Sequence, residues 1–284
     1  MKRITRNTCL IAMPLFSALT ASPALGEFGY YESFEDSSIG WLPLNSTVTA
    51  VSSGTNGIDA TDGSFYGLIG PGASSAQTGA FDSFGANNAT FGVGFTAGTD
   101  IYIDLSDANI AAGTYGFDYS IAINDNNGDP AQDNIFHVGA VDDGNGGFDL
   151  AINASHNTDF LLNTFKINNS PFGTSPEVFT DSGWYTFQVT FTPSASPDAV
   201  DVLFEVLDEA GDTFFSATTQ NGPAQYTLST AGGDRYGWLT YVETDSGLAV
   251  DSTFVNAVPE PASLALLGLG GLALLRRRTR SDED

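Results

Sequence analysis

The acidic segment at residues 125–133 carries oxygen-bearing side chains at a spacing that could bind a cation. Asp125, Asn127 and Asp129 occupy alternate positions, and Asp133 follows as a further carboxylate. Calcium in proteins binds about six to eight oxygens from carboxylates, amides and carbonyls, and these side chains are of those types. The segment therefore predicts a candidate calcium site.

Two residues of this segment and its surroundings exclude the EF-hand form of calcium loop. Pro130 stands where that loop has its glycine, and Phe136 stands where it has its bidentate glutamate. An irregular calcium site between two strands and a solvated polar turn between Ile123 and Ile135 are the two interpretations that remain.

Serine-based catalysis is not indicated, because a nucleophilic serine needs a histidine base within hydrogen-bond reach. The chain has only His137 and His156, and no Gly-x-Ser-x-Gly sequence accompanies them. His137 alternates with Phe136 and Val138, which predicts an exposed histidine on the polar face of a strand. No His-x-x-x-His or thiol pair is present to ligate zinc. We assign no catalytic residue from the sequence.

Glycoside hydrolysis needs two carboxyl groups about 5–10 Å apart. Asp201 and Glu205 share one face of a predicted strand but are separated by about 13 Å at ~3.3 Å per residue. Glu205, Asp208 and Glu209 do not reproduce the Glu-x-Asp-x-x-Glu pattern of jelly-roll glucanases. Carboxylates on different strands could still meet, so an enzyme stays open as the alternative.

Aromatic side chains can stack on sugar rings, although they also dominate sandwich cores. The candidates are Trp41, Tyr66, Trp184, Tyr236 and Trp238. Trp184 and Trp238 fall in strongly patterned strands, where we expect burial. Trp41 follows a Ser-Ser-Ile-Gly turn, so we expect it to be exposed and available for ligand stacking.

Strict alternation of apolar and polar residues indicates the strands that must position these side chains. Residues 184–192 place aromatic and branched residues on one face and threonines on the other, and 200–207 repeat the pattern after a proline-bounded turn. The further predicted strands are 28–34, 47–52, 65–69, 90–95, 101–105, 115–123, 135–141, 148–153, 213–218, 236–243 and 249–255.

Turn sequences rich in Asn, Asp and Gly separate these strands, and no amphipathic helices fall between them. No repeat of fixed period is visible, which disfavours a propeller or solenoid. The sequence therefore predicts an all-β fold, an antiparallel two-sheet sandwich whose expected form is a jelly roll.

The chain is strongly acidic, with a formal net charge of −25. Between the two terminal signals described below, Lys166 and Arg235 are the only basic lysine or arginine residues. Such a body repels nucleic-acid phosphates and anionic lipids, so neither is an expected partner. The acidic surface could serve solubility or attract divalent cations.

The N-terminal residues 1–26 have the features of a secretory signal peptide. Lys2, Arg3 and Arg6 form a basic region, an apolar stretch follows at 9–20, and small residues precede residue 27. Cys9 is the only cysteine and lies in this peptide, so the body at 27–257 has no disulfide.

The C-terminal stretch begins with two prolines, which favour the start of a new helix. An uncharged run at 262–275 follows; as a helix it would rise only about 21 Å, against about 30 Å of bilayer hydrocarbon. An arginine cluster then marks the cytoplasmic end, and 281–284 form an acidic tail. This pattern predicts transient membrane contact. Its marking residues are Val258, Pro259, Glu260, Pro261, Arg276, Arg277 and Arg278.

Residues 258–280 resemble the PEP-CTERM sorting signal in its Pro-Glu-Pro motif, its short apolar helix and its basic end. The resemblance implies processing by an exosortase-type membrane transpeptidase and export to the cell surface or exopolysaccharide matrix of a Gram-negative bacterium. The signal is an address and carries no activity of its own.

The body also resembles concanavalin- or laminin-G-like jelly-roll domains, through short aromatic strand sequences at 183–187, 236–239 and 247–251. With the sorting signal, this implies an exported, non-catalytic surface or matrix protein with extracellular polysaccharide as the expected partner and no required cofactor beyond the calcium candidate. The alternative is a secreted carbohydrate-active enzyme, a glycoside hydrolase or lyase.

The paired signals predict that the exported protein lacks both ends, starting near Glu27 and ending near the Pro259-Glu260-Pro261 motif. Intact-mass measurement of protein recovered from the cell surface checks this. Recovery of chains that still carry Arg276 and the acidic tail would contradict it.

Overall fold

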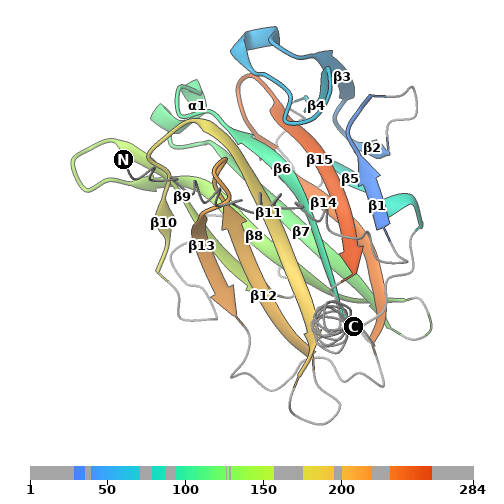
Figure 1. The fold of residues 1–284 in the computed structure, drawn as a ribbon. Helices are drawn as coiled ribbons and strands as arrows, with labels where there is room; N and C mark the ends of the chain where they lie inside the picture. The colour runs from blue at the N-terminus through green and yellow to red at the C-terminus, as the bar shows by residue number, and fades with distance from the viewer. Residues whose placement is uncertain are drawn as a thin grey trace, which may run out of the picture.

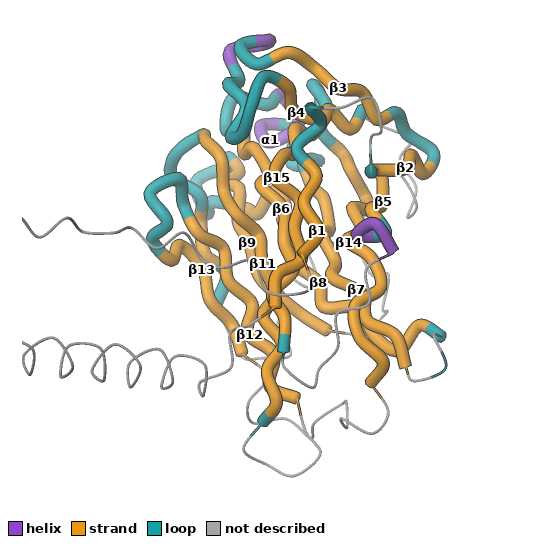
Figure 2. Tube along the Cα trace, turned by 45° about the vertical axis from the view of Figure 1, so that its right-hand side comes forward, coloured by secondary structure: helices purple, strands orange, loops and turns teal. Residues whose placement is uncertain are grey.

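The computed structural model describes residues 29–35, 40–70, 79–86, 94–125, 127, 129–156, 175–194, 200–218 and 231–257. They form two antiparallel sheets packed face to face (Figure 1). In these parts of the chain, helix is confined to α1 (Ala108–Ala111) and the 3-10 turns η1 (Thr55–Gly57) and η2 (Phe84–Ala86), as Figure 2 shows. The predicted all-β sandwich is confirmed. No helix among the described residues is long and apolar enough to cross a membrane.

Both terminal signals, 1–26 and 258–280, and the acidic tail lie outside the described residues.

Sheet A, at the front in Figure 1, contains eight of the described strands. Strands β1 (Gly29–Glu32) and β4 (Phe65–Ile69) pair with different parts of the same strand, β15 (Leu248–Ala257). The order across the rest of the sheet is β13 (Thr213–Thr218), β12 (Val200–Leu207), β11 (Gly183–Pro193), β6 (Phe95–Ile103), β15 (Leu248–Ala257), β4 (Phe65–Ile69) and β3 (Val48–Ser52).

Sheet B lies behind it and contains seven described strands. Its order is β10 (Glu177–Val178), β9 (Phe148–His156), β8 (Pro130–Asp142), β7 (Gly116–Asp125), β14 (Ala231–Glu243), β5 (Gly79–Asp82) and β2 (Trp41–Leu44). Consecutive strands β6 and β7, and likewise β14 and β15, lie in different sheets, so the chain crosses repeatedly between the layers.

The hairpin of β11 and β12 forms as its alternation predicts. Phe187 pairs with Val206, and Phe191 pairs with Val202. Inward-facing residues of both strands are buried, whereas the intervening Thr186, for example, is half-buried. A period of two places one apolar face of the pair against the core.

Aromatic rings from both sheets meet in that core. The Phe136 ring of β8 lies edge to face against Phe187 of β11, with centroids 5.5 Å apart, and against Phe204 of β12 at 5.4 Å. Phe117 of β7, which belongs to the same sheet as Phe136, also contacts Phe187. Edge-to-face pairs are the preferred ring geometry.

Several elements differ from the sequence prediction. The predicted strands 90–95 and 101–105 overlap the two ends of one strand, β6, which runs through Gly98; residues 90–93 of the first prediction lie outside the described residues. β2 and β5 were not predicted, because they are four residues long and each carries a strand-disfavouring residue, Pro43 or Gly79. β2 is an edge strand, where proline costs no ladder hydrogen bond, and a Cβ on Gly79 would collide with the Leu239 carbonyl.

Truncating Phe187 or Phe204 to alanine should lower the free energy of unfolding by ~3–5 kcal/mol, because each ring is fully buried and leaves a cavity. Denaturant unfolding of the purified protein measures this. Leu42→Ala, at a side chain that is 49% exposed, is the control and should change stability by less than ~0.5 kcal/mol. Equal effects at core and control positions would contradict the assigned core.

Candidate functional site

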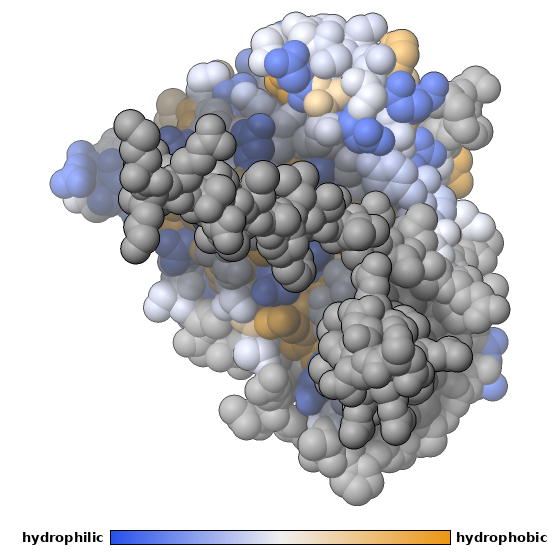
Figure 3. Space-filling model, in the orientation of Figure 1, coloured by the Kyte–Doolittle hydropathy of each residue, from blue (hydrophilic) through white to orange (hydrophobic). Residues whose placement is uncertain are grey.

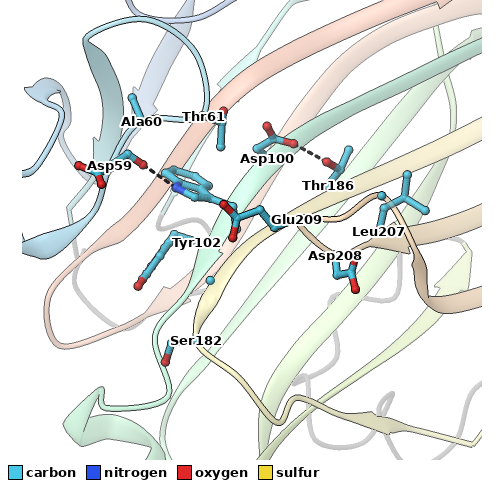
Figure 4. A pocket seen from close by; sticks show the side chains of 13 residues that line it. Asp59, Ala60, Thr61, Asp100, Tyr102, Ser182, Thr186, Leu207, Asp208 and Glu209 are labelled. Atoms are coloured by element: carbon cyan, nitrogen blue, oxygen red, sulfur yellow. Dashed lines mark hydrogen bonds between the residues drawn. The ribbon is translucent and has the colours of Figure 1, made fainter.

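An open cavity of about 540 Å³ lies on the face of sheet A that points away from the core (Figure 4). We call it the sheet A groove. Four segments that are distant in sequence surround it: the loop after η1, β6, the start of β11 and the turn between β12 and β13. Its lining includes Asp59, Ala60, Thr61, Asp100, Tyr102, Ser182, Trp184, Thr186, Leu207, Asp208 and Glu209.

A small second hydrophobic cluster forms the floor of the groove. Trp184 is 8% exposed and packs edge to face against Tyr66 and Tyr102. Its indole Nε1–H donates to the Asp59 carbonyl oxygen at 2.7 Å, which ties the floor to the loop above it. Trp184 is thus buried as predicted, and the half-buried Tyr102 offers the more accessible ring.

One buried carboxylate holds the loop that forms a wall of the groove. Asp251 Oδ2 accepts hydrogen bonds from the backbone N–H groups of Thr61 at 2.9 Å and Asp62 at 3.2 Å, and from the Thr61 hydroxyl at 3.1 Å. Asp251 Oδ1 accepts from the Ser252 N–H at 2.8 Å. Burial raises the pKa of Asp251 to about 6, although these hydrogen bonds oppose the shift.

Asp100 lies directly opposite Asp251 in the pairing of β6 with β15. Its Oδ1 accepts from the Thr186 hydroxyl at 2.6 Å, and burial raises its pKa. Two acidic residues therefore occupy paired positions on neighbouring strands, an arrangement that the enzymatic alternative requires. Asp251, however, is fully buried and occupied with the loop, so this pair does not present two carboxyl groups to a sugar.

The charge of the groove is entirely negative among the described residues that line it. Asp100, Asp208 and Glu209 contribute carboxylates, Asp59 lines the groove beside the indole through its backbone carbonyl, and the lining contains no lysine or arginine. Burial raises the pKa of Tyr102, and the charges of Asp104 and Glu209 add to that effect. More widely, the described surface is mainly hydrophilic at the β3–β4 loop and the β8–β9 turn (Figure 3).

Trp41 corrects the expectation of an exposed stacking residue. It is 1% exposed, and its Nε1–H donates to the Thr253 hydroxyl at 2.9 Å. The preceding turn does not expose the ring, because β2 lies against β5 and turns the indole toward the core. Trp41 is therefore not available for ligand stacking.

His137 corrects a second expectation of exposure. It is fully buried on the face of sheet B opposite the core, with Nδ1 at 2.7 Å from Asp118 Oδ1 and Nε2 at 2.6 Å from Ser155 Oγ. Its neighbours on that face, Ala122 and Ala151, are buried as well. The alternation correctly separates the two faces, but it does not show that the second face is also covered.

The Asp118–His137–Ser155 chain has the connectivity of a serine-hydrolase relay. All three side chains are at most 4% exposed, and all three project from paired strands of sheet B. In this structure the three side chains hydrogen-bond to one another, and these bonds satisfy polar groups that the fold buries. His156 is the last residue of β9 and is half-buried.

The predicted calcium residues form a turn between β7 and β8. Asp125 Oδ1 accepts from the N–H groups of Asn127 at 2.8 Å and Asp129 at 2.9 Å, while Asp133 lies within β8, paired with Ala122. No group of three or more acidic, histidine or cysteine side chains suited to a metal ion occurs among the described residues.

The groove is not predictable from the sequence alone, because four separate segments build it. The available signal was Tyr102, an aromatic residue at the outward position between Ile101 and Ile103. Asp201 and Glu205 lie on the outward face of β12, as predicted, but do not line the groove.

Comparison with known proteins identifies the C-terminal stretch. Residues 257–280 match the PEP-CTERM protein-sorting motif. The chain carries an exosortase sorting motif. The motif indicates a protein that an exosortase-type system processes and sorts to the cell surface. The match begins one residue before the predicted boundary at 258 and ends at the predicted 280.

No curated protein matches the chain. Three solved structures are similar to it at low identity. The CBM2 module of the evolved Dit of Lactobacillus casei BL23 phage J-1 is 12% identical, with a TM-score of 0.40 and coverage of 82% of this chain and 98% of that one. A protein of unknown function from Shewanella oneidensis MR-1 is 13% identical, with a TM-score of 0.41 and coverage of 88% and 96%. The receptor-binding domain of botulinum neurotoxin type G is 7% identical, with a TM-score of 0.35 and coverage of 81% and 48%.

The raised pKa of Asp251 predicts that the protein becomes more stable as the pH falls from 7.5 to 5. The folded-state pKa of about 6 exceeds the unfolded value of ~3.9, so the folded state binds the proton more tightly. This stabilisation is complete below pH ~4 and is lost as the pH rises through about 6.

Over the pH range from 7.5 to 5 the contribution of Asp251 is on the order of 1 kcal/mol. Asp251→Asn should flatten the pH dependence of the unfolding free energy by this amount. Asp149→Asn removes the same charge at an exposed position and is the control. A slope that responds equally to both substitutions would show that overall charge, and not Asp251, sets it.

Proposed function

We propose that this protein is an exported, non-catalytic component of the cell surface or exopolysaccharide matrix of a Gram-negative bacterium, and that the sheet A groove binds polysaccharide. We propose in addition that the sandwich is of the jelly-roll, concanavalin-like kind. The sorting motif supports the destination. The observation that carries the binding function is the Tyr102 ring above the Trp184 floor, with carboxylates around it.

The size and chemistry of the groove suit a few sugar units. Small-molecule sites typically have volumes of about 300–1,000 Å³, an apolar or aromatic surface and a few directed polar groups. The groove has about 540 Å³, Tyr102 for the apolar face of a sugar ring, and carboxylate oxygens that accept hydrogen bonds from hydroxyl groups.

The Asp100–Asp251 pair is not arranged for hydrolysis, which supports binding as the proposed role of the groove. Hydrolysis needs an acid and a second carboxylate on either side of the scissile bond. Asp100 reaches the groove, but its cross-strand neighbour Asp251 anchors the loop at 59–62. A glycoside hydrolase or lyase is the alternative, and release of oligosaccharide from a bound polymer would establish it in place of our proposal.

Tyr102→Ala should weaken binding of the protein to a retained polysaccharide about tenfold, equivalent to about 1.4 kcal/mol, because the stacking surface is removed. Affinity electrophoresis of the purified protein through gels that contain individual polysaccharides measures retardation.

Phe148→Ala is the matched control, because this ring is 41% exposed and lies on sheet B. Circular dichroism confirms that both variants are folded. Retardation that survives in Tyr102→Ala, or that is lost equally in Phe148→Ala, would place binding elsewhere.

A further inference from the structure

The sheet A groove combines an aromatic ring with carboxylates from separate elements. Asp100 projects from β6 beside Tyr102, and Asp208 and Glu209 come from the turn after β12. Figure 4 shows Asp59 and Asp208 on opposite sides of the view, with Tyr102 and Asp100 between them. A ligand in the groove would therefore meet negative charge from several directions.

We propose that the groove selects polysaccharides with protonated amino groups, such as polymers of glucosamine, over neutral and uronic-acid polysaccharides. This inference rests on the proposed function and names the chemical class of its ligand. An ammonium group donates charge-assisted hydrogen bonds to carboxylates, which are stronger than bonds between neutral partners. The same cation is attracted to the face of a tyrosine ring.

The residues of the groove provide both interactions at one place. Tyr102 and Glu209 are close enough for the carboxylate charge to act on the phenol, and Asp100 is oriented by the Thr186 hydroxyl at 2.6 Å. Asp208 is oriented by the turn itself, since its Oδ1 accepts from the N–H groups of Ala210 and Asp212. Ordered carboxylates lose less conformational freedom when a ligand binds.

The charge also excludes competing glycans. A uronic-acid polymer would bring carboxylates against the carboxylates of the groove, with no lysine or arginine among the described lining residues to offset the repulsion. Across the whole chain the formal net charge of −25 adds to that repulsion at long range. A neutral glucan would be tolerated, but it would gain no charge-assisted bond.

Titration calorimetry of the purified full-length protein tests the inference with four hexasaccharides of glucosamine, N-acetylglucosamine, glucose and galacturonate. The titrations are carried out near pH 6 and at one fixed ionic strength. We expect the glucosamine hexamer to bind at least tenfold more tightly than the β-1,4-glucose hexamer, which differs from it by the amino group. We expect the galacturonate hexamer to bind most weakly.

Two double variants separate the groove from bulk charge. Asp100→Asn with Glu209→Gln should abolish the preference for glucosamine. Asp149→Asn with Glu177→Gln removes the same charge at exposed positions of sheet B and should retain the preference. Polylysine serves as the probe for unspecific attraction between polycation and polyanion.

The outcomes are distinguishable. Equal binding of the glucose and glucosamine hexamers would overturn the inference and leave the proposed polysaccharide binding intact. Failure of all four hexamers to bind would overturn both. Equal loss of the preference in the two double variants would show bulk charge at work and overturn the inference. The same conclusion would follow if the groove double variant weakened polylysine binding as much as it weakens binding of the glucosamine hexamer.

Discussion

Phe136 of sheet B contacts Phe187 and Phe204 of sheet A edge to face, and these contacts hold the two layers of the body together. The predicted mature chain has no cysteine, so no disulfide supports the layers and the stability of the body must come from burial. Every other feature depends on this arrangement, because inward side chains determine which residues of the same strands point outward. Tyr102 and Trp184 face the groove because Ile101, Ile103 and Tyr185 face the core.

A second constraint concerns polar groups that the fold buries. Asp251 has no basic partner among the described residues, yet it is stabilised by two N–H groups and a hydroxyl from the loop at 61–62 and by the N–H group of the next residue, Ser252. Burial of a carboxyl group is costly unless it is hydrogen-bonded or protonated, and the raised pKa of Asp251 reflects that cost. The hydrogen bonds from Thr61 and Asp62 to Asp251 also position the loop that forms a wall of the groove.

The sequence predicted those elements whose pattern is local. The bounds of β4, β12 and β13 match the predicted strands, because each alternates cleanly between turn signals. The burial of His137 and Trp41 could not be predicted from such local patterns. His137 and Trp41 are buried by contacts that arise only after the sheets and loops assemble, whereas alternation reports only which residues share a face. The groove could not be predicted from local patterns either, because the residues that line it are more than a hundred positions apart in sequence.

The C-terminal motif and the body of the protein have separate roles. The C-terminal motif indicates sorting to the cell surface by an exosortase-type system. The body supplies an acidic, aromatic groove on a rigid sheet. A crystal structure of the protein grown with a saturating glucosamine hexasaccharide tests the central claim most directly. The account predicts a sugar ring packed on Tyr102 with its amino group within hydrogen-bond distance of a groove carboxylate. Sugar bound on another face of the sandwich, or a groove that stays empty at saturation, would contradict it.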